Sequence, residues 1–174
     1  RKIQDLDVEL RQAMLRDQFC VYYQPQVCLK DRSLVGFEAL VRWEHPTEGI
    51  LSPATFIDRL EKLKLISTLG HDVLRKVSKQ LVKWEECFNA PSRIAVNLSA
   101  VQLSNMQTAE ALQYAIFDGG ISPDRITLEL TESAALSDMN TTIEILYKLR
   151  QHGIAFALDD FGTGYSALSH LRVL

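Results

Sequence analysis

The feature that most constrains the fold is a strand followed by a helix, repeated at a spacing of about 30 residues. Three short apolar runs each end in a polar residue before a segment with helical patterning. The polar residues are Asn97, Glu129 and Asp159, which are 32 and 30 residues apart. This is the length of a strand–helix–strand unit, whose strands are parallel and whose sheet is covered by helices. We therefore predict an α/β barrel or an open parallel sheet, and 174 residues are fewer than the ~250 of a closed barrel.

Composition excludes several classes of protein. The net charge is −3 and hydrophobic residues make up 47% of the sequence, so no general footprint for nucleic acid or anionic membranes is expected. No apolar run approaches the ~20 residues of a membrane span, and no signal peptide is visible. The three cysteines have no zinc-binding spacing. We expect a cytoplasmic domain with reduced thiols, and an anchor elsewhere in a longer parent protein is compatible with this.

The segments outside the repeat suggest how the chain begins. Residues 1–16 have a helical pattern and are expected to connect an upstream domain to a single domain over residues 17–174. Residues 19–29 and 34–43 are predicted to form an antiparallel hairpin, with Pro25 favouring an edge strand. The remaining predicted helices are 53–63, 66–88, 99–118 and 138–152.

Side-chain alternation along the strands predicts one polar face. Asn97, Glu129 and Asp159 each share a strand face with small or polar residues, while the opposite faces are apolar. Glu38 has a similar place on its strand, and Asp160 follows Asp159. Oxygen ligands without His or Cys suit Mg²⁺, Mn²⁺ or Ca²⁺ rather than zinc. A metal site at the strand ends is therefore predicted; the alternative is a set of separate helix caps and salt bridges.

The ordered motifs resemble the EAL domain family of cyclic-di-GMP phosphodiesterases. The signature-like segment is Glu38-Ala39-Leu40-Val41-Arg42-Trp43. The other motifs are Gln24-Pro25-Gln26, Asn97-Leu98-Ser99, Glu129-Leu130-Thr131-Glu132-Ser133 and the segment Asp159-Asp160-Phe161-Gly162-Thr163-Gly164-Tyr165-Ser166. The resemblance covers residues 19 to 174, and the order of the motifs makes it specific.

The resemblance implies a modified TIM (β/α)8 barrel whose first strand is antiparallel, and a hydrolase that converts cyclic di-GMP to linear pGpG. It implies a two-metal site for Mg²⁺ or Mn²⁺. Glu38, Asn97, Glu129 and Asp159 match ligands of one ion and Asp160 a ligand of the second, with Glu38, Asp159 and Asp160 expected to be catalytic. Gln24 and Arg42 match substrate contacts. Glu132 matches a residue that anchors the loop 161–166, which links the metal site to dimerisation.

The resemblance also implies partners and leaves alternatives open. It implies a homodimer and an upstream sensory or diguanylate cyclase domain, with no nucleic acid polymer as a ligand. The family's last strands, with their Lys-x-Asp segment, catalytic Glu and substrate-binding Gln, are not found before Leu174. We therefore expect an incomplete barrel and an inactive or severely impaired chain when it is taken alone. The alternatives for the parent protein are a non-catalytic cyclic-di-GMP receptor and a regulatory or interaction module.

Overall fold

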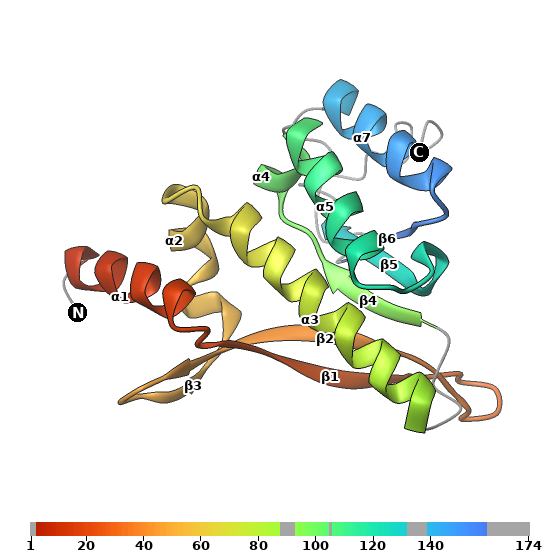
Figure 1. The fold of residues 1–174 in the computed structure, drawn as a ribbon, viewed down its shortest axis with the longest axis horizontal. Coiled ribbons are helices and arrows are strands. Elements are labelled where there is room, and N and C mark those ends of the chain that lie inside the picture. Colours follow the sequence, from red (N-terminus) through yellow and green to blue (C-terminus); the bar gives the residue numbers. More distant parts are fainter. Residues whose placement is uncertain (1–2, 88–92, 105, 132–138, 160–174) are drawn as a thin grey trace.

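The computed structural model describes residues 3–87, 93–104, 106–131 and 139–159 (Figure 1). The helices are α1 (Ile3–Leu15), α2 (Ile57–Lys62), α3 (Ile66–Cys87), α4 (Ala100–Leu103), α5 (Met106–Asp118) and α7 (Met139–Gln151). The strands are β1 (Phe19–Val27), β2 (Leu34–His45), β3 (Gly49–Leu51), β4 (Arg93–Asn97), β5 (Ile126–Thr131) and β6 (Ala155–Asp159). Two short 3-10 turns, η1 (Pro53–Thr55) and η2 (Pro123–Arg125), connect them.

The strands form one mixed sheet in the order β1-β2-β4-β5-β6, and β3 pairs with the end of β2. β1 is antiparallel to β2, while β2, β4, β5 and β6 run parallel. The predicted α/β class with an antiparallel first strand is confirmed. Over the described residues the sheet is not closed, as expected for an incomplete barrel. Pro25 lies on β1, at one edge of the described sheet, the place where a residue without an N–H is best tolerated.

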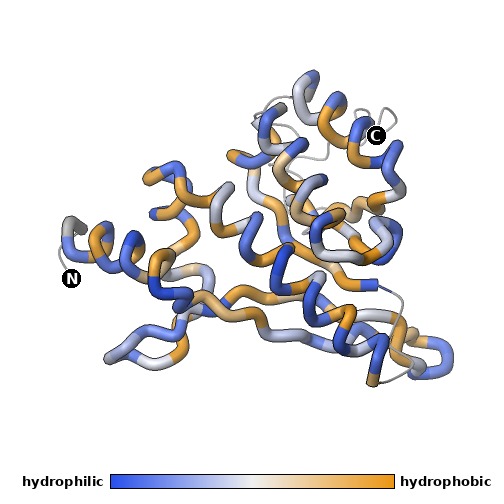
Figure 2. Tube along the Cα trace, in the orientation of Figure 1, coloured by the Kyte–Doolittle hydropathy of each residue, from blue (hydrophilic) through white to orange (hydrophobic). Residues whose placement is uncertain are grey.

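Helices cover one face of the sheet, and this is where the core lies. α3 packs beside α5, and α5 beside α7 (Figure 1). The strand side chains beneath them are fully or almost fully buried: Ile94, Val96, Ile126, Leu128 and Leu130. Apolar and polar residues alternate along these helices, as expected for helices with one buried side (Figure 2). The opposite face of the sheet is therefore left to the polar strand residues.

Two predicted helices are interrupted, and both predictions of a single helix are wrong. The helix expected over 53–63 is a 3-10 turn followed by α2, because Phe56 adopts φ −138° and ψ −22° between them. Its ring lies in the core, with centroids 5.3 Å from Phe19 and 6.1 Å from Trp43. The helix expected over 99–118 is divided into α4 and α5. Ser104 follows α4 and donates its hydroxyl back to the Val101 carbonyl, a bond that competes with helix continuation.

The strand β3 lies between the predicted strand 34–43 and the predicted helix 53–63, where the sequence analysis assigns no strand. It pairs with β2 through Trp43 opposite Leu51 and His45 opposite Gly49. The turn between them is held by His45, whose Nδ1 accepts the backbone N–H groups of Thr47 at 3.3 Å and Glu48 at 3.1 Å. Local hydrogen bonding around one buried histidine therefore makes a hairpin that patterning alone does not reveal.

α1 packs against the same core as the sheet. Leu10 and Ala13 are fully buried, and the Arg59 guanidinium of α2 makes a two-point ion pair with Asp7 of α1. The proposed domain boundary after residue 16 stays a prediction. None of the helices in the described part of the chain is both long and apolar enough to cross a membrane.

Candidate functional site

The strand register brings the predicted residues to one face of the sheet. Gln24 on β1 pairs with Glu38 on β2, and Asn97 on β4 pairs with Glu129 on β5. Glu38 is level with Ala95, two residues before Asn97, and Asp159 on β6 is level with Thr131, two residues after Glu129. Because side chains two residues apart share a face, all five lie on the side opposite the helices. The polar groups are thus staggered over three successive levels rather than gathered in one row.

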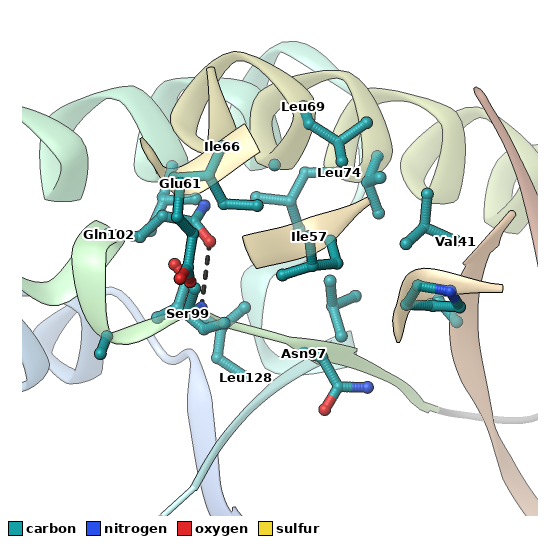
Figure 3. Close-up of a pocket in the computed structure, with 18 of the residues that line it drawn as sticks. Val41, Ile57, Glu61, Ile66, Leu69, Leu74, Asn97, Ser99, Gln102 and Leu128 are labelled. Carbon is teal, nitrogen blue, oxygen red and sulfur yellow. Dashed lines mark hydrogen bonds between the residues drawn. The ribbon is translucent and has the colours of Figure 1, made fainter. Parts of the chain in front are cut away.

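Two of these groups contact each other directly. Asn97 donates its Nδ2–H to Glu38 Oε1 at 2.8 Å across the parallel β2–β4 pair. This bond uses the amide nitrogen, so the amide oxygen of Asn97 and the second carboxylate oxygen of Glu38 are not engaged by it. Figure 3 shows the Asn97 side chain on the other side of β4 from Ile57 and Leu74 of the helical layer. The arrangement leaves oxygen atoms of Asn97 and Glu38 on the polar face at this point.

Glu129 experiences the negative charge of its neighbours. The pKa of its carboxyl is raised above the ordinary value, first by burial and then by the charges of Glu38 and Asp159. A side-chain hydrogen bond from Gln26 opposes this shift. A carboxylate whose pKa is raised by burial and by neighbouring negative charges is stabilised in its ionised form when a divalent cation binds beside it. Half-buried Glu129 therefore favours bound positive charge at this place.

The residues present fit a hard divalent cation by their chemistry. Glu38, Asn97, Glu129 and Asp159 supply carboxylate and amide oxygens, the donors that Mg²⁺ and Mn²⁺ prefer. As they stand, no three His, Cys, Asp or Glu side chains of the described ranges form a group that could hold a metal ion. Rotation of side chains that are half-buried or exposed would be needed to bring the oxygens onto one ion.

A cavity of about 590 Å³, lined by polar and apolar side chains alike, lies on this face. Gln26, Thr127 and Glu129 line it together with Ala95 and Ala157. The two alanines leave the space open between larger polar side chains. Gln26 is a site residue that the sequence analysis did not assign, although it lies two positions after Gln24 and therefore on the same face. Side-chain alternation predicts the face of the sheet on which Gln26 lies. Its hydrogen bond to Glu129 depends on how the strands are arranged in the folded sheet.

A second cavity, of about 430 Å³, lies on the other side of the sheet (Figure 3). Apolar side chains of the sheet and of helices α2 and α3 line it, including Ile57, Leu74 and Leu128. At one end the backbone N–H of Ser99 donates to Gln102 Oε1 at 3.1 Å, which closes the first turn of α4. Its lining is mainly apolar, and of the predicted ligands only Asn97 borders it in the described part of the chain, so we place the predicted chemistry on the opposite face.

The predicted substrate contacts also lie on the polar face. Gln24 is exposed and opposite Glu38. Arg42 lies four residues after Glu38 on β2; its guanidinium donates Nη1–H to the Val41 carbonyl at 2.8 Å and lies over the Tyr22 ring, 5.8 Å from the centroid. Tyr22 is a second residue that the sequence analysis did not assign. The predictions for Asp160, Glu132 and the loop 161–166 fall outside the described residues.

Comparisons with known proteins show which family the chain resembles in sequence and fold. MucR of Pseudomonas aeruginosa, a bifunctional diguanylate cyclase/cyclic di-GMP phosphodiesterase, is 39% identical over 166 residues, which are 95% of this chain and 24% of MucR. The cyclic di-GMP phosphodiesterase NbdA of the same organism is 38% identical over 169 residues, or 97% of this chain and 22% of NbdA. The chain thus spans about a fifth to a quarter of the length of the curated relatives that it matches.

The solved structure of the MucR phosphodiesterase in complex with c-di-GMP has a TM-score of 0.91 to this chain at 38% identity, covering 98% of this chain and 69% of that one. Its fold is therefore shared along nearly all of the present chain. The family model described as EAL domain matches residues 7–174, a range that includes every strand and all the polar-face residues described above. With sequence, fold and family model in agreement, the chain belongs to the EAL domain family.

Proposed function

We propose that the protein containing this chain hydrolyses cyclic di-GMP to linear pGpG at a divalent metal site on the polar face of the sheet. The observation that carries the proposal is the placement of four oxygen-bearing side chains on one face of the parallel strands. Glu38 lies within β2, and Asn97, Glu129 and Asp159 lie at or near the carboxyl ends of β4, β5 and β6. Ligands of parallel α/β proteins bind at these strand ends. Membership of the EAL family and the names of MucR and NbdA supply the substrate.

Each polar residue has a proposed role. Glu38, Asn97, Glu129 and Asp159 would hold one Mg²⁺ or Mn²⁺, and Asp160 would contribute to a second. Bound ions of this kind lower the pKa of a water and neutralise charge on the phosphoryl oxygens. The Asn97–Glu38 hydrogen bond orients the Glu38 carboxylate before an ion arrives, and the Gln26 bond to Glu129 favours the ionised ligand. Glu132 would anchor the loop 161–166.

Arg42 is suited to bind a phosphate of the substrate. It is half-buried on a face rich in carboxylates, yet no ion pair joins it to an acidic residue within the described ranges. Among the described residues, one of its five N–H donors is used, by the Val41 carbonyl. A planar guanidinium with donors available matches two oxygens of a phosphodiester. Gln24, exposed on the neighbouring strand, is proposed to contact the same ligand.

The test is turnover of cyclic di-GMP by the full-length protein with Mg²⁺ or Mn²⁺, with the product identified as pGpG by chromatography. Glu38→Gln and Glu129→Gln are expected to lower turnover by orders of magnitude. Glu61→Gln is the matched control, because Glu61 is also a half-buried carboxylate but lines the apolar cavity on the helix side. Binding without turnover would favour the receptor alternative, and neither binding nor turnover would refute the proposal.

Assembly and location are proposed on the same basis. We propose a homodimer, linked to an upstream sensory or diguanylate cyclase domain in the cytoplasm. MucR, whose name includes diguanylate cyclase activity, is about four times longer than its matched region, which is compatible with further domains. Sedimentation of the full-length protein tests the dimer, since a monomer at micromolar concentration would contradict it.

A further inference from the structure

Tyr22 presents an aromatic ring on the polar face of the sheet. Its exposed fraction is 49%, whereas the neighbouring aromatic residue on the other face of β1, Tyr23, is partly buried against the core. On β1 it lies between Gln24 and Cys20, and its partner across the antiparallel pair is Leu40. The direct partner of Arg42 is Cys20. The Arg42 side chain must therefore run diagonally across the pair to reach the Tyr22 ring.

The Arg42 guanidinium is held at two points. Its Cζ lies 5.8 Å from the Tyr22 ring centroid, within the range of a cation–π contact. Its Nη1 donates to the Val41 carbonyl at 2.8 Å. Arginine has several rotatable bonds and loses rotamer entropy when it is fixed. A ring below it and a carbonyl beside it fix the group before any ligand binds.

The charges nearby show why such support is needed. Glu38 lies four residues before Arg42 on the same strand and face, and Glu44 follows two residues after it. An unsupported arginine on this face would be attracted to these carboxylates, and a salt bridge would occupy the donors that a phosphate requires. In the structure it makes no such pair with either. The ring and the carbonyl keep its remaining N–H groups available.

We propose that Tyr22 is a positioning residue for Arg42: its ring holds the guanidinium ready for a phosphodiester oxygen of the substrate and away from the carboxylates of the same face. The inference rests on the proposed function and deepens it, because it assigns part of the substrate affinity to an aromatic residue outside the signature-like segment. The ring face is the active element, so the hydroxyl group is dispensable.

A double-mutant cycle on the full-length protein tests this. The readouts are the Kd for cyclic di-GMP in EDTA, where no metal contributes, and KM and kcat with Mg²⁺. Tyr22→Leu is expected to raise Kd and KM about two- to five-fold, the range of one partly exposed cation–π contact, with little change in kcat. Tyr22→Phe keeps the ring and is expected to match the wild type. In an Arg42→Met background, Tyr22→Leu is expected to have no further effect.

Each other outcome refutes a defined part. An equal effect of Tyr22→Leu with and without Arg42 would show direct stacking on the substrate and overturn the positioning role. Loss of affinity in Tyr22→Phe would assign the effect to the hydroxyl and also overturn it. Unchanged affinity in Tyr22→Leu overturns this inference alone, whereas a wild-type protein that neither binds nor hydrolyses cyclic di-GMP overturns the proposed function with it. Thermal unfolding of each variant checks the fold, which an exposed position should leave intact.

Discussion

Gly36 lies on β2, two residues before Glu38, and has no room for a side chain between itself and β4. It is buried and level with Arg93 in the parallel pair. A Cβ at this position would lie 2.7 Å from the Arg93 carbonyl oxygen, whereas ordinary contact begins at 3.4 Å. The strands would have to separate by about 0.7 Å, the difference between these two distances. The oxygen belongs to the backbone of a paired strand, so it cannot rotate away as a side chain would.

The magnitude of a Gly36→Ala change follows from this contact. Overpacking of a buried position lowers the free energy of unfolding by about 1–3 kcal/mol. For a chain of this size that corresponds to a fall in Tm of roughly 2–12 °C. A displacement of this size between β2 and β4 exceeds the ~0.5 Å within which the groups of a binding site must be held, and it acts on the two strands that carry the Asn97–Glu38 hydrogen bond. We therefore expect both a less stable protein and a weaker metal site.

The assay is thermal unfolding in EDTA and again with Mn²⁺, where the rise in Tm on adding the ion reports metal binding. Gly36→Ala is expected to lower Tm in EDTA and to reduce that rise. Gly49→Ala is the control: its φ of +75° makes alanine strained, yet nothing lies within 4 Å of the added Cβ, and β3 carries none of the proposed ligands. It should lose stability but keep the full response to Mn²⁺. An unchanged Tm and an unchanged response in Gly36→Ala would refute the reasoning.

Three further predictions concern charge. In EDTA, Glu129→Gln should raise Tm above that of the wild type, because the ionised form of Glu129 is the destabilised one. The gain in Tm should grow as pH rises from about 4.5 through the raised pKa of Glu129. Mn²⁺ should stabilise only the wild type, and a variant that still responds to Mn²⁺ would exclude Glu129 as a ligand. In calorimetric titrations, Mn²⁺ affinity of the wild type should fall as pH is lowered through the same range, since a proton and the cation compete for one carboxylate; a flat profile would contradict this. Lys76 donates to Asp17 at 2.5 Å and contacts Asp72 at 2.8 Å, so Lys76→Met should lose about 1 kcal/mol in urea unfolding at pH 7 after allowance for solvent screening. Burial would raise the pKa of Asp72, but Lys76 and Arg75 lower it overall, so the loss should shrink as pH falls through that lowered pKa; a pH-independent loss would argue against the ion pair.

Some predictions failed where the contact of a single side chain fixed the local backbone. Ser52 and Pro53 predict a helix start, but the first turn is 3-10 because burial of Phe56 between two core rings fixes its backbone. The pattern around Ser99 predicts one helix, and the break after Leu103 follows from a hydroxyl-to-carbonyl bond that competes with the helix. The hairpin β3 depends on the orientation of His45. Each of these depends on a contact that residue patterning does not encode.

The sequence by itself determined the strand–helix repeat, the antiparallel first hairpin and the face on which Glu38, Asn97 and Glu129 lie. Alternation fixes these because a strand has a period of two residues whatever surrounds it. Only the tertiary structure decided how far along the strand direction each side chain lies and which side chains on that face contact one another. The register places Asn97 beside Glu129, whereas Glu38 is level with the residue two positions before Asn97. It also places Arg42 opposite Cys20, so that the Arg42 side chain crosses the strand pair diagonally to the Tyr22 ring. Register depends on how strands distant in sequence pack together, so the period within each strand cannot supply it.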